Sequence, residues 1–180
     1  MTQPDQNPWE WDEARWRGIV GRARAGRSLR PATWPVGIRT ASWDFSVDTL
    51  SIIREMGLLY DSSLMADDDA YELLDGGEPT GIVELPPEWI RDDAVYFNML
   101  RFAALRPYTP PSAVEEIFRA EFDGAHAEGG LFLLTMHPHV IGHRSRIALL
   151  DRLVAYMKAQ PGVVFLTHEE VARWCLEQAR

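Results

Sequence analysis

The sequence predicts an α/β fold with a mostly parallel β-sheet, and three observations support this prediction. Short apolar runs typical of strands alternate along the chain with amphipathic segments typical of helices. Residues 131–136 form a mostly apolar run, as in a parallel strand that is buried on both faces. Helix-capping patterns recur just before the amphipathic segments. The chain of 180 residues is long enough for one domain with a sizeable core.

The first half of the chain predicts strands separated by helices and by one long loop. We expect a helix over residues 7–24, with capping residues at its start. A second helix is expected over residues 46–57, ended by Gly57. Residues 65–81 are acidic and contain glycine, which indicates a loop with at most a turn of helix around residues 71–74. The expected strands span residues 36–41, 58–60 and 82–85.

The second half predicts two more strands and three helices. Ser112 and Glu115 form a capping box at the start of a helix that Gly129 ends. Thr167 and Glu170 form another capping box before the last helix. The expected strands span residues 131–136 and 163–166, and a further helix spans residues 145–158.

Composition and charge exclude several classes of function. The chain has 27 acidic and 18 basic residues and a formal net charge of −9. An acidic chain without a long basic run is poorly suited to bind nucleic acid or an anionic membrane, so we expect neither partner. Residues 1–6 lack the apolar core of a signal peptide, which favours a cytoplasmic location. Cys175 is the single cysteine, so no internal disulfide can form.

Polar side chains follow the expected strands, where parallel β/α folds place their functional groups. His137 ends an apolar run and could protonate a leaving group near neutral pH, or it could be a structural histidine. Arg39 could orient a carboxylate or form a structural ion pair. Asp61 and Glu84 are candidates to bind substrate, although a carboxylate at a strand end can also cap the next helix.

The sequence offers no convincing set of metal ligands. The acidic trio at residues 67–69 lacks the spaced ligands of a calcium loop, so we interpret it as a solvated loop. His139 and His143 have the spacing that places two imidazoles on one helical face. Pro138 and Gly142 argue against a helix there, so we interpret this spacing as accidental.

Four segments, in this order, resemble motifs of the NodB-type polysaccharide deacetylase family. The first holds Arg39 and Trp43, the second reads Gly-Leu-Leu-Tyr-Asp-Ser-Ser, and the last ends in a histidine followed by proline. The resemblance extends from about residue 7 to the end and favours the branch with peptidoglycan-deacetylase-like and allantoinase-like members. The segments are residues 36–46, 57–63, 83–86 and 133–138.

The resemblance implies the C-terminal portion of a distorted (β/α) barrel that hydrolyses a carbon–nitrogen bond other than a peptide bond. The typical reaction removes acetyl from an N-acetylated sugar, with a divalent metal, commonly zinc, that polarises the carbonyl group and activates water. An aspartate is the base and a histidine is the acid in such enzymes. His137 matches the acid, Arg39 matches the residue that orients the base, and Trp43 matches an aromatic wall of the cleft.

The chain also departs from the family pattern. Ala41 stands where the family usually has proline, and the Asp-Asp and His-x-x-x-His motifs of the metal site have no counterpart. We therefore expect residues 1–180 to be one domain, truncated at its N-terminal side relative to the family, without its own metal ligands and with impaired hydrolysis. The exposed edge of such a domain predicts self-association or dependence on a missing N-terminal half.

Two other functions are compatible with the same residues. The chain could be a non-catalytic module that binds carbohydrate through an aromatic cleft, or an allantoinase-like amidohydrolase that acts on a small ureide. Metal binding and release of acetate from N-acetylglucosamine oligomers distinguish the deacetylase from the binding module.

Overall fold

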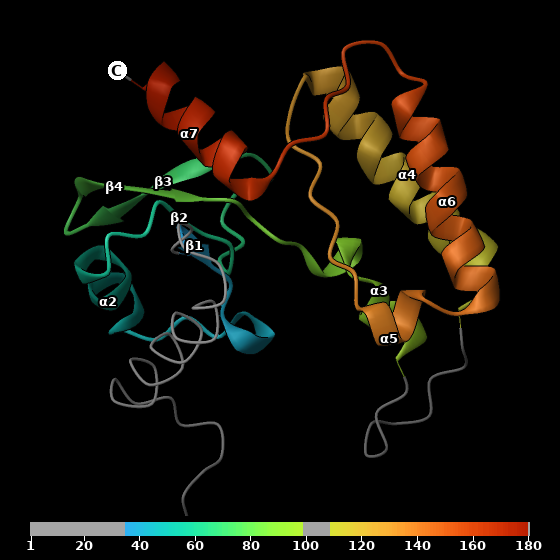
Figure 1. Ribbon diagram of the computed structural model, residues 1–180, viewed down its shortest axis with the longest axis horizontal. Coiled ribbons are helices and arrows are strands. Elements are labelled where there is room, and N and C mark those ends of the chain that lie inside the picture. Colours follow the sequence, from blue (N-terminus) through green and yellow to red (C-terminus); the bar gives the residue numbers. More distant parts are fainter. Residues whose placement is uncertain (1–34, 99–108, 180) are drawn as a thin grey trace, which may run out of the picture.

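A computed structural model describes residues 35–98 and 109–179 of the chain, so the helix expected over residues 7–24 lies outside the described residues. Two regions stand side by side in Figure 1. The sheet region consists of residues 35–84 and helix α7, His168–Gln178. The helical region consists of helices α3 to α6 and lies beyond the end of the sheet.

The sheet has four strands in the order β1-β2-β4-β3. Strands β1, β2 and β4 are parallel neighbours, and β3 pairs with β4 in the antiparallel direction. The strands are Gly37–Ile38 (β1), Tyr60–Asp61 (β2), Tyr71–Asp75 (β3) and Glu78–Glu84 (β4). Helix α2, Thr49–Glu55, packs Ile53 against Leu58 and Ile82 in the core of this region. The mixed sheet with its helices confirms the predicted α/β class.

Residues 65–70 form a loop as expected, but from Tyr71 onward the hairpin of β3 and β4 replaces the expected loop and its turn of helix. Gly76 and Gly77 connect the strands with φ values of 60° and 93°, in a two-residue turn where Asp75 pairs with Glu78. Such a turn needs positive φ at both central residues, which glycine adopts without steric cost. Of the acidic residues that indicated a loop, Asp67 to Asp69 lie exposed before the hairpin and Asp75 and Glu78 are exposed at its turn, while Leu73 is buried.

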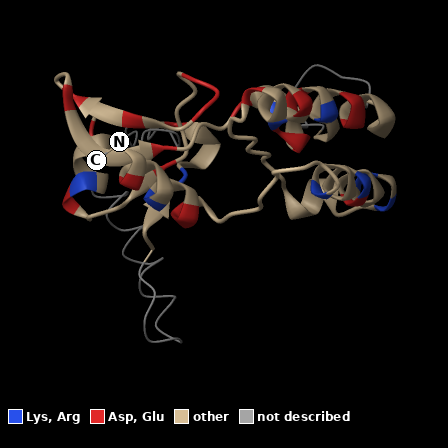
Figure 2. Ribbon diagram, turned by 90° about the horizontal axis from the view of Figure 1, so that it is seen from above, with Lys and Arg blue, Asp and Glu red and all other residues tan. Residues whose placement is uncertain are grey.

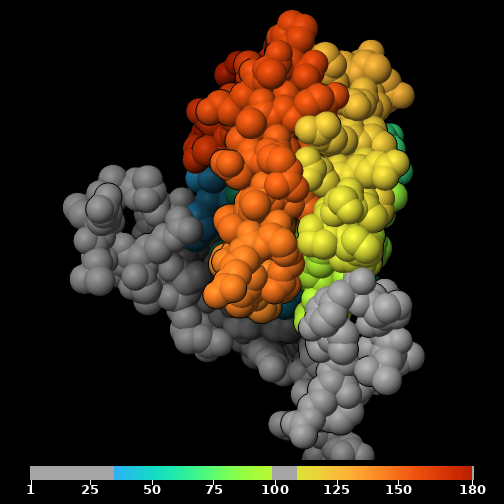
Figure 3. Space-filling view, turned by 90° about the vertical axis from the view of Figure 1, so that its right-hand side faces the viewer, coloured from blue at the N-terminus to red at the C-terminus, as the bar shows by residue number. Residues whose placement is uncertain are grey.

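The helical region is organised around two long helices, α4 at Pro111–Glu128 and α6 at Arg144–Lys158. Figure 3 shows them side by side on one face of the molecule. Val114, Phe118, Leu149 and Leu153 have no exposed surface and fill the space between them. Acidic residues dominate α4 and basic residues dominate α6 (Figure 2), and Arg152 pairs with Glu115 across the two helices.

One of the two predicted capping boxes in the second half is correct. Thr167 and Glu170 cap α7 reciprocally, with Thr167 Oγ1 accepting from the Glu170 amide. The box predicted at Ser112 and Glu115 is wrong: α4 begins at Pro111 after Pro110, without a side-chain cap. Glu115 is instead held by the Arg152 guanidinium, because a charged partner competes for its carboxylate.

Residues 131–136, the linking segment, run between the two regions (Figure 1) and form a single parallel bridge, between Thr135 and Asp92. Leu131 and Leu133 pack against the cluster that contains Val83 and Ala172 in the sheet region. The even-numbered residues, Phe132, Leu134 and Met136, pack against the core of the helical region. The segment is therefore extended and apolar on both faces, as predicted, but it is not a regular strand.

Residues 163–166 were also predicted to be a strand, and the structure contradicts this. They run extended between α6 and α7, and none of them pairs with another strand of the described residues. Val164, Phe165 and Leu166 are exposed, with 71%, 56% and 52% of their surface accessible. A strand forms only when its backbone groups find a partner strand, and no described segment lies in that position.

Two 3₁₀ turns and two short α-helices complete the described fold. A 3₁₀ turn, η1, spans Ala41–Trp43 at the end of β1. After β4, the 3₁₀ turn η2, Trp89–Arg91, leads into α3, Asp93–Phe97, neither of which we predicted. The short helix α5, Pro138–Ile141, lies where we expected a loop. No helix of the described residues is both long and apolar enough to cross a membrane.

Candidate functional site

His137 lies next to the buried carboxylate of Asp93, and the two side chains form the centre of the candidate site. His137 is the N-cap residue of α5, at the end of the linking segment, and its side chain is 37% exposed. Its ring Nδ1 lies 2.7 Å from Oδ1 of Asp93, and its backbone amide lies 3.1 Å from both carboxylate oxygens. A carboxylate partner requires a proton on Nδ1, which directs Nε2 away from Asp93.

A short parallel pairing of backbones places Asp93 opposite His137. The Thr135 amide donates to the Arg91 carbonyl, and the Asp93 amide donates to the Thr135 carbonyl. The carboxylate of Asp92 accepts from the Ala94 amide at 2.6 Å and so caps α3. The linking segment thus fixes the distance between the Asp93 and His137 side chains.

Asp92, Asp93 and His137 offer three possible metal-ligand atoms within 4.8 Å of one another, in the only such group among the described residues. Asp92 is nearly buried, and desolvation by burial raises its pKa above the usual range. Its Oδ1 lies 3.7 Å from Nδ1 of His137. Sequence reasoning predicted His137 but missed both aspartates. The adjacent Asp-Asp pair was a visible signal, although their partner is 44 residues away from Asp93.

The three side chains fit a hydrogen-bonded acid better than a metal centre. A catalytic zinc site takes three protein ligands and leaves one position open. Here the hydrogen bond at 2.7 Å already joins Asp93 Oδ1 to Nδ1 of His137, so an ion at this place would have to displace that proton. The backbone amide of His137 also lies 3.1 Å from both oxygens of Asp93 and holds the carboxylate in this orientation.

Arg39 links the end of β1 to the linking segment. Its guanidinium donates from Nε to the Ser62 carbonyl at 3.0 Å and from Nη1 to Oγ1 of Thr135 at 3.1 Å. Its Nη2 lies 3.4 Å from Nε2 of His168. Burial, together with the charge of Arg39, lowers the pKa of His168, which favours the neutral ring that accepts this contact. Within the described residues these hydrogen bonds of Arg39 reach Ser62, Thr135 and His168, and none of them reaches a carboxylate, the partner that the family resemblance implied.

Asp61 and Glu84 form a buried carboxyl pair at the end of two neighbouring parallel strands. The register pairs them directly, and neither has exposed surface. Glu84 Oε1 accepts from the amides of Ser63 and Leu64, at 2.8 Å and 2.9 Å. Burial and the charge of Asp61 raise the pKa of Glu84 to about 8, so a proton on Glu84 can be donated to Asp61 at neutral pH. This burial favours a structural role, and their assignment to substrate binding stays a prediction.

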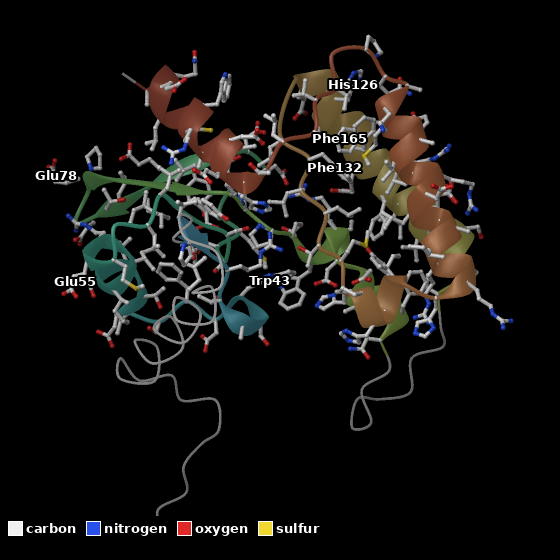
Figure 4. All side chains as sticks on the ribbon, viewed as in Figure 1. Trp43, Glu55, Glu78, His126, Phe132 and Phe165 are labelled. Atoms are coloured by element: carbon white, nitrogen blue, oxygen red, sulfur yellow. The ribbon has the colours of Figure 1, made fainter. Side chains whose placement is uncertain are left out.

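Trp43 stands between the two regions (Figure 4), at the end of η1. Its ring makes an edge-on contact with Trp89, with the ring centroids 4.2 Å apart. Arg39 thus reaches Thr135, two residues before His137, and Trp43 reaches Trp89, four residues before Asp93. A cavity of about 410 Å³ opens elsewhere, beside Leu58 and Ile82, and none of the predicted site residues lines it.

The sequence is similar to two curated proteins, although no family model matches the chain. It is 25% identical over 171 residues to the peptidoglycan deacetylase-like protein FGM2 of Gibberella zeae, covering 77% of this chain and 51% of that protein. It is 24% identical over 166 residues to the peptidoglycan deacetylase of Helicobacter pylori, covering 77% of this chain and 56% of that protein. The chain therefore spans about half the length of the curated relatives it matches.

The fold is similar to three crystal structures. A protein from Mycobacterium smegmatis assigned as a polysaccharide deacetylase matches 93% of this chain with a TM-score of 0.83 and 31% identity, over 58% of its own length. PuuE allantoinase matches 91% of this chain, and 53% of its own length, with a TM-score of 0.73 and 25% identity. A protein from Pseudomonas aeruginosa, assigned to the polysaccharide deacetylases, matches 90% of this chain and 53% of its own, with a TM-score of 0.73 and 24% identity, and supports the fold alone.

These likenesses agree with the motifs in the sequence. The solved structures have the fold that the sequence predicted, and this chain supplies only part of it, as a small sheet with its helices. The similarity in sequence and in fold to these proteins agrees with the resemblance of the four segments to NodB-type deacetylase motifs.

Proposed function

We propose that this chain carries the acid-supplying part of a metal-dependent hydrolase that removes acetyl groups from an N-acetylated sugar or polysaccharide. The observation that carries the proposal is the contact between His137 and the buried Asp93, at 2.7 Å. The names of the similar proteins support the reaction class, since they refer to deacetylases of peptidoglycan and polysaccharide.

His137 is the group that protonates the leaving nitrogen in this proposal. Asp93 accepts from Nδ1 and fixes the ring, so Nε2 is the nitrogen available to the substrate. When the imidazole is protonated, Nε2 can give its proton to the departing amine. Proton transfer of this kind accounts for roughly 100- to 10,000-fold in rate in other enzymes.

Arg39 positions the acid without touching it. Its guanidinium joins Ser62 on the sheet side to Thr135, two residues before His137. A contact of this kind holds the linking segment against the end of β2, and with it the backbone that carries His137. Arg39 is therefore a positioning residue in this proposal.

The divalent metal that the family resemblance implies is part of the proposal, with zinc as the expected ion. When bound, it polarises the carbonyl group and activates water. Asp92, Asp93 and His137 do not fit as its complete ligand set, so we place its ligands outside the described residues. Zinc titration with the H137A variant tests this placement. We expect unchanged zinc binding, and a loss of all binding would assign the ion to His137.

The experiment that tests the function measures acetate released from N-acetylglucosamine oligomers by the chain and by its longest natural form. We expect H137A and D93N to lower acetate release by at least about 100-fold at saturating zinc. His143→Ala is the matched control, since His143 is an exposed residue at the start of α6, and we expect nearly full activity from it. Equal activity of H137A and H143A contradicts the assignment of the acid.

Two other functions are separated by the same assay. The likeness to PuuE allantoinase favours a small ureide as a second candidate substrate, and hydrolysis of allantoin without acetate release would support it. Binding of sugar oligomers with no turnover at any zinc concentration would support a non-catalytic carbohydrate-binding module.

Self-association is the proposed consequence of the exposed residues 163–166. Three consecutive apolar side chains are exposed there, on a backbone that pairs with no described strand. Such an edge binds other chains through its free backbone groups and apolar surface. We expect light scattering to show oligomers of the wild type and a monomer for the double variant with Val164→Lys and Phe165→Lys. A wild-type monomer over the whole concentration range contradicts this expectation.

A further inference from the structure

Arg91 buries a guanidinium group whose hydrogen-bonding capacity is only partly used. Its side chain is 4% exposed, and its Nη1 donates to Oδ1 of Asp68 at 3.1 Å and to Oε2 of Glu121 at 3.5 Å. Its Nε and Nη2 have no hydrogen-bond partner among the described residues. Buried donors without partners cost stability, and an apolar side chain in such a place is often as stable or more so. The presence of this guanidinium therefore needs a reason other than stability.

The two carboxylates that bind Arg91 come from different regions of the molecule. Asp68 belongs to the loop of residues 65–70, the acidic loop, which precedes the hairpin of the sheet region, and its side chain is 82% exposed. Glu121 lies on α4 in the helical region. Arg91 itself is the last residue of η2. Its side chain thus ties the segment after β4 to both regions.

The backbone of Arg91 belongs to the pairing that sets Asp93 opposite His137. The Arg91 carbonyl accepts from the Thr135 amide at 2.8 Å, and the Thr135 carbonyl accepts from the Asp93 amide at 3.2 Å. Asp93 is two residues after Arg91, and His137 is two residues after Thr135, so the 2.7 Å contact of the two side chains continues the same parallel pairing. A side chain that holds Arg91 in place therefore also holds this register.

The acidic loop also contacts the start of the linking segment. Oδ1 of Asp69 accepts from the Leu131 amide at 2.6 Å. A Cβ atom on Gly130 would lie 2.7 Å from the same oxygen, so the missing side chain lets the carboxylate approach. Asp68 and Asp69 belong to one loop, which therefore holds the linking segment at its start and, through Arg91, near its end.

We propose that Arg91 is a positioning residue for the acid: its ion pairs keep the Arg91–Asp93 backbone in register with the linking segment, so that Asp93 meets Nδ1 of His137. Arg91 acts through Asp93, and the acidic loop acts through Arg91. The inference rests on the proposed role of His137 as the acid, and it connects that acid to a loop outside the site. A misplacement of about 1 Å can lower the rate of an enzyme roughly 100-fold, so a small loss of register is sufficient.

The first test determines which ring nitrogen of His137 carries the proton, by nitrogen-15 NMR of the chain in mildly alkaline solution. The ring signals are assigned by their loss in His137→Ala. We expect the proton on Nδ1 in wild type, where Asp93 accepts it, and a mixture of both tautomers in Arg91→Met. Arg91→Lys keeps a cation for the two carboxylates, so it should restore most of the wild-type signal.

Arg54→Met is the matched control for Arg91→Met. Arg54 also forms an ion pair with an aspartate, Asp75, but the pair is exposed and Arg54 lines the cavity beside Leu58. We expect the tautomer of His137 and the rate of acetate release to be the same in this variant as in wild type.

Stability and rate separate positioning from a purely structural role. We expect the midpoint of thermal unfolding of Arg91→Met to equal or exceed that of wild type, because an apolar side chain replaces donors without partners. In the acetate assay we expect its kcat to fall roughly 10-fold while KM stays within about twofold. Asp68→Asn weakens the ion pair from its exposed side and should lower kcat by roughly 2- to 3-fold. A purely structural role predicts the reverse, a lower midpoint with an unchanged tautomer and kcat.

Two results of the NMR experiment overturn the inference: a wild-type ring with its proton on Nε2, and an Arg91→Met ring with the proton still on Nδ1. If Arg91→Met does not fold, Asp68→Asn decides by the same measurements, and wild-type values of both the tautomer and kcat overturn the inference. The proposed deacetylation fails separately. A tautomer that depends on Arg91 in a chain that releases no acetate supports the positioning of His137 and removes the enzyme.

Discussion

Apolar side chains fill the interiors of both regions, but the sheet region also buries a carboxyl pair between neighbouring strands. The helical region is filled by apolar side chains from α4 and α6, including Phe118 and Leu153. The sheet region buries polar groups at the ends of its parallel strands, above all Asp61 and Glu84. Apolar packing tolerates changes of pH, whereas a buried carboxyl pair depends on a single proton. We therefore expect the stability of the sheet region, which supports Arg39, to depend more on pH than that of the helical region.

The largest expected effect comes from breaking the apolar region. Phe118 has no exposed surface and contacts the ring of Tyr96, so Phe118→Ala leaves a cavity. We expect a loss of about 3–5 kcal/mol in the free energy of unfolding, measured with a chemical denaturant. Ile147→Ala is the control, since Ile147 is exposed on the same pair of helices, and its cost should stay below about 1 kcal/mol. Similar losses for both variants would show that the core lies elsewhere.

The pH dependence of the free energy of unfolding tests the buried carboxyl pair of the sheet region. The pKa of Glu84 rises from 4.5 to about 8 on folding, so the folded state holds a proton that the unfolded state has lost between these values. The stability that depends on this proton is complete below pH 4.5 and is lost as the pH rises through 8. The slope for one proton is at most about 1.4 kcal/mol per pH unit. Unfolding measured between pH 5 and 8.5 checks the sign.

Glu84→Gln is the variant that isolates this proton. The glutamine amide has nearly the shape of the neutral carboxyl group and can donate to Asp61 at any pH. We therefore expect the variant to resemble wild type at pH 5 and to be the more stable protein at pH 8.5. Arg39 and Tyr71 also interact electrostatically with the pair, and both proteins keep the interactions of these residues with Asp61. If the free energies of unfolding of wild type and Glu84→Gln change with pH in parallel, the raised pKa of Glu84 is refuted.

The smallest expected effect concerns the exposed ion pair of the helical region. Arg152 binds Glu115 across α4 and α6, on the outside of the apolar core. An exposed pair of this kind contributes about 0–1 kcal/mol and is screened by salt. Glu115→Gln should therefore lower the midpoint of thermal unfolding by no more than a few degrees, and less in 1 M salt. A larger loss would place this pair among the main contacts between the two helices.

Local signals in the sequence predicted the helices better than the strands. Thr167 and Glu170 are close in sequence and form the predicted box, and the glycine that ends α4, Gly129, has the left-handed φ of 73°. Residues 163–166 have a strand-like composition, yet composition does not supply the partner that a strand needs. The hairpin around Gly76 was missed because the acidic, glycine-containing composition of residues 65–81 indicated a loop.

Of the candidate site, the sequence predicted the residue whose own position along the chain indicates a function. His137 follows an apolar run, so its sequence context indicated a functional side chain. Asp93 belongs to a segment without periodicity, and its role depends on the backbone pairing of Asp92 with Thr135, which no short window of sequence contains. The contact of Trp43 with Trp89 depends in the same way on two distant turns. Long-range pairing, and not residue type, is the information that sequence reasoning lacked.

The two-faced packing of the linking segment has a consequence for the tolerated length of the chain. Odd-numbered side chains such as Leu133 face the sheet region, and even-numbered ones such as Leu134 face the helical region. Inserting one residue after Gly130 would exchange the two faces throughout the segment, because side chains alternate strictly along an extended backbone. It would also shift His137 along the segment by about 3.3 Å relative to Asp93. A change that alters no site residue would thus separate the acid from its carboxylate, so spacing here is as much a part of the chemistry as identity.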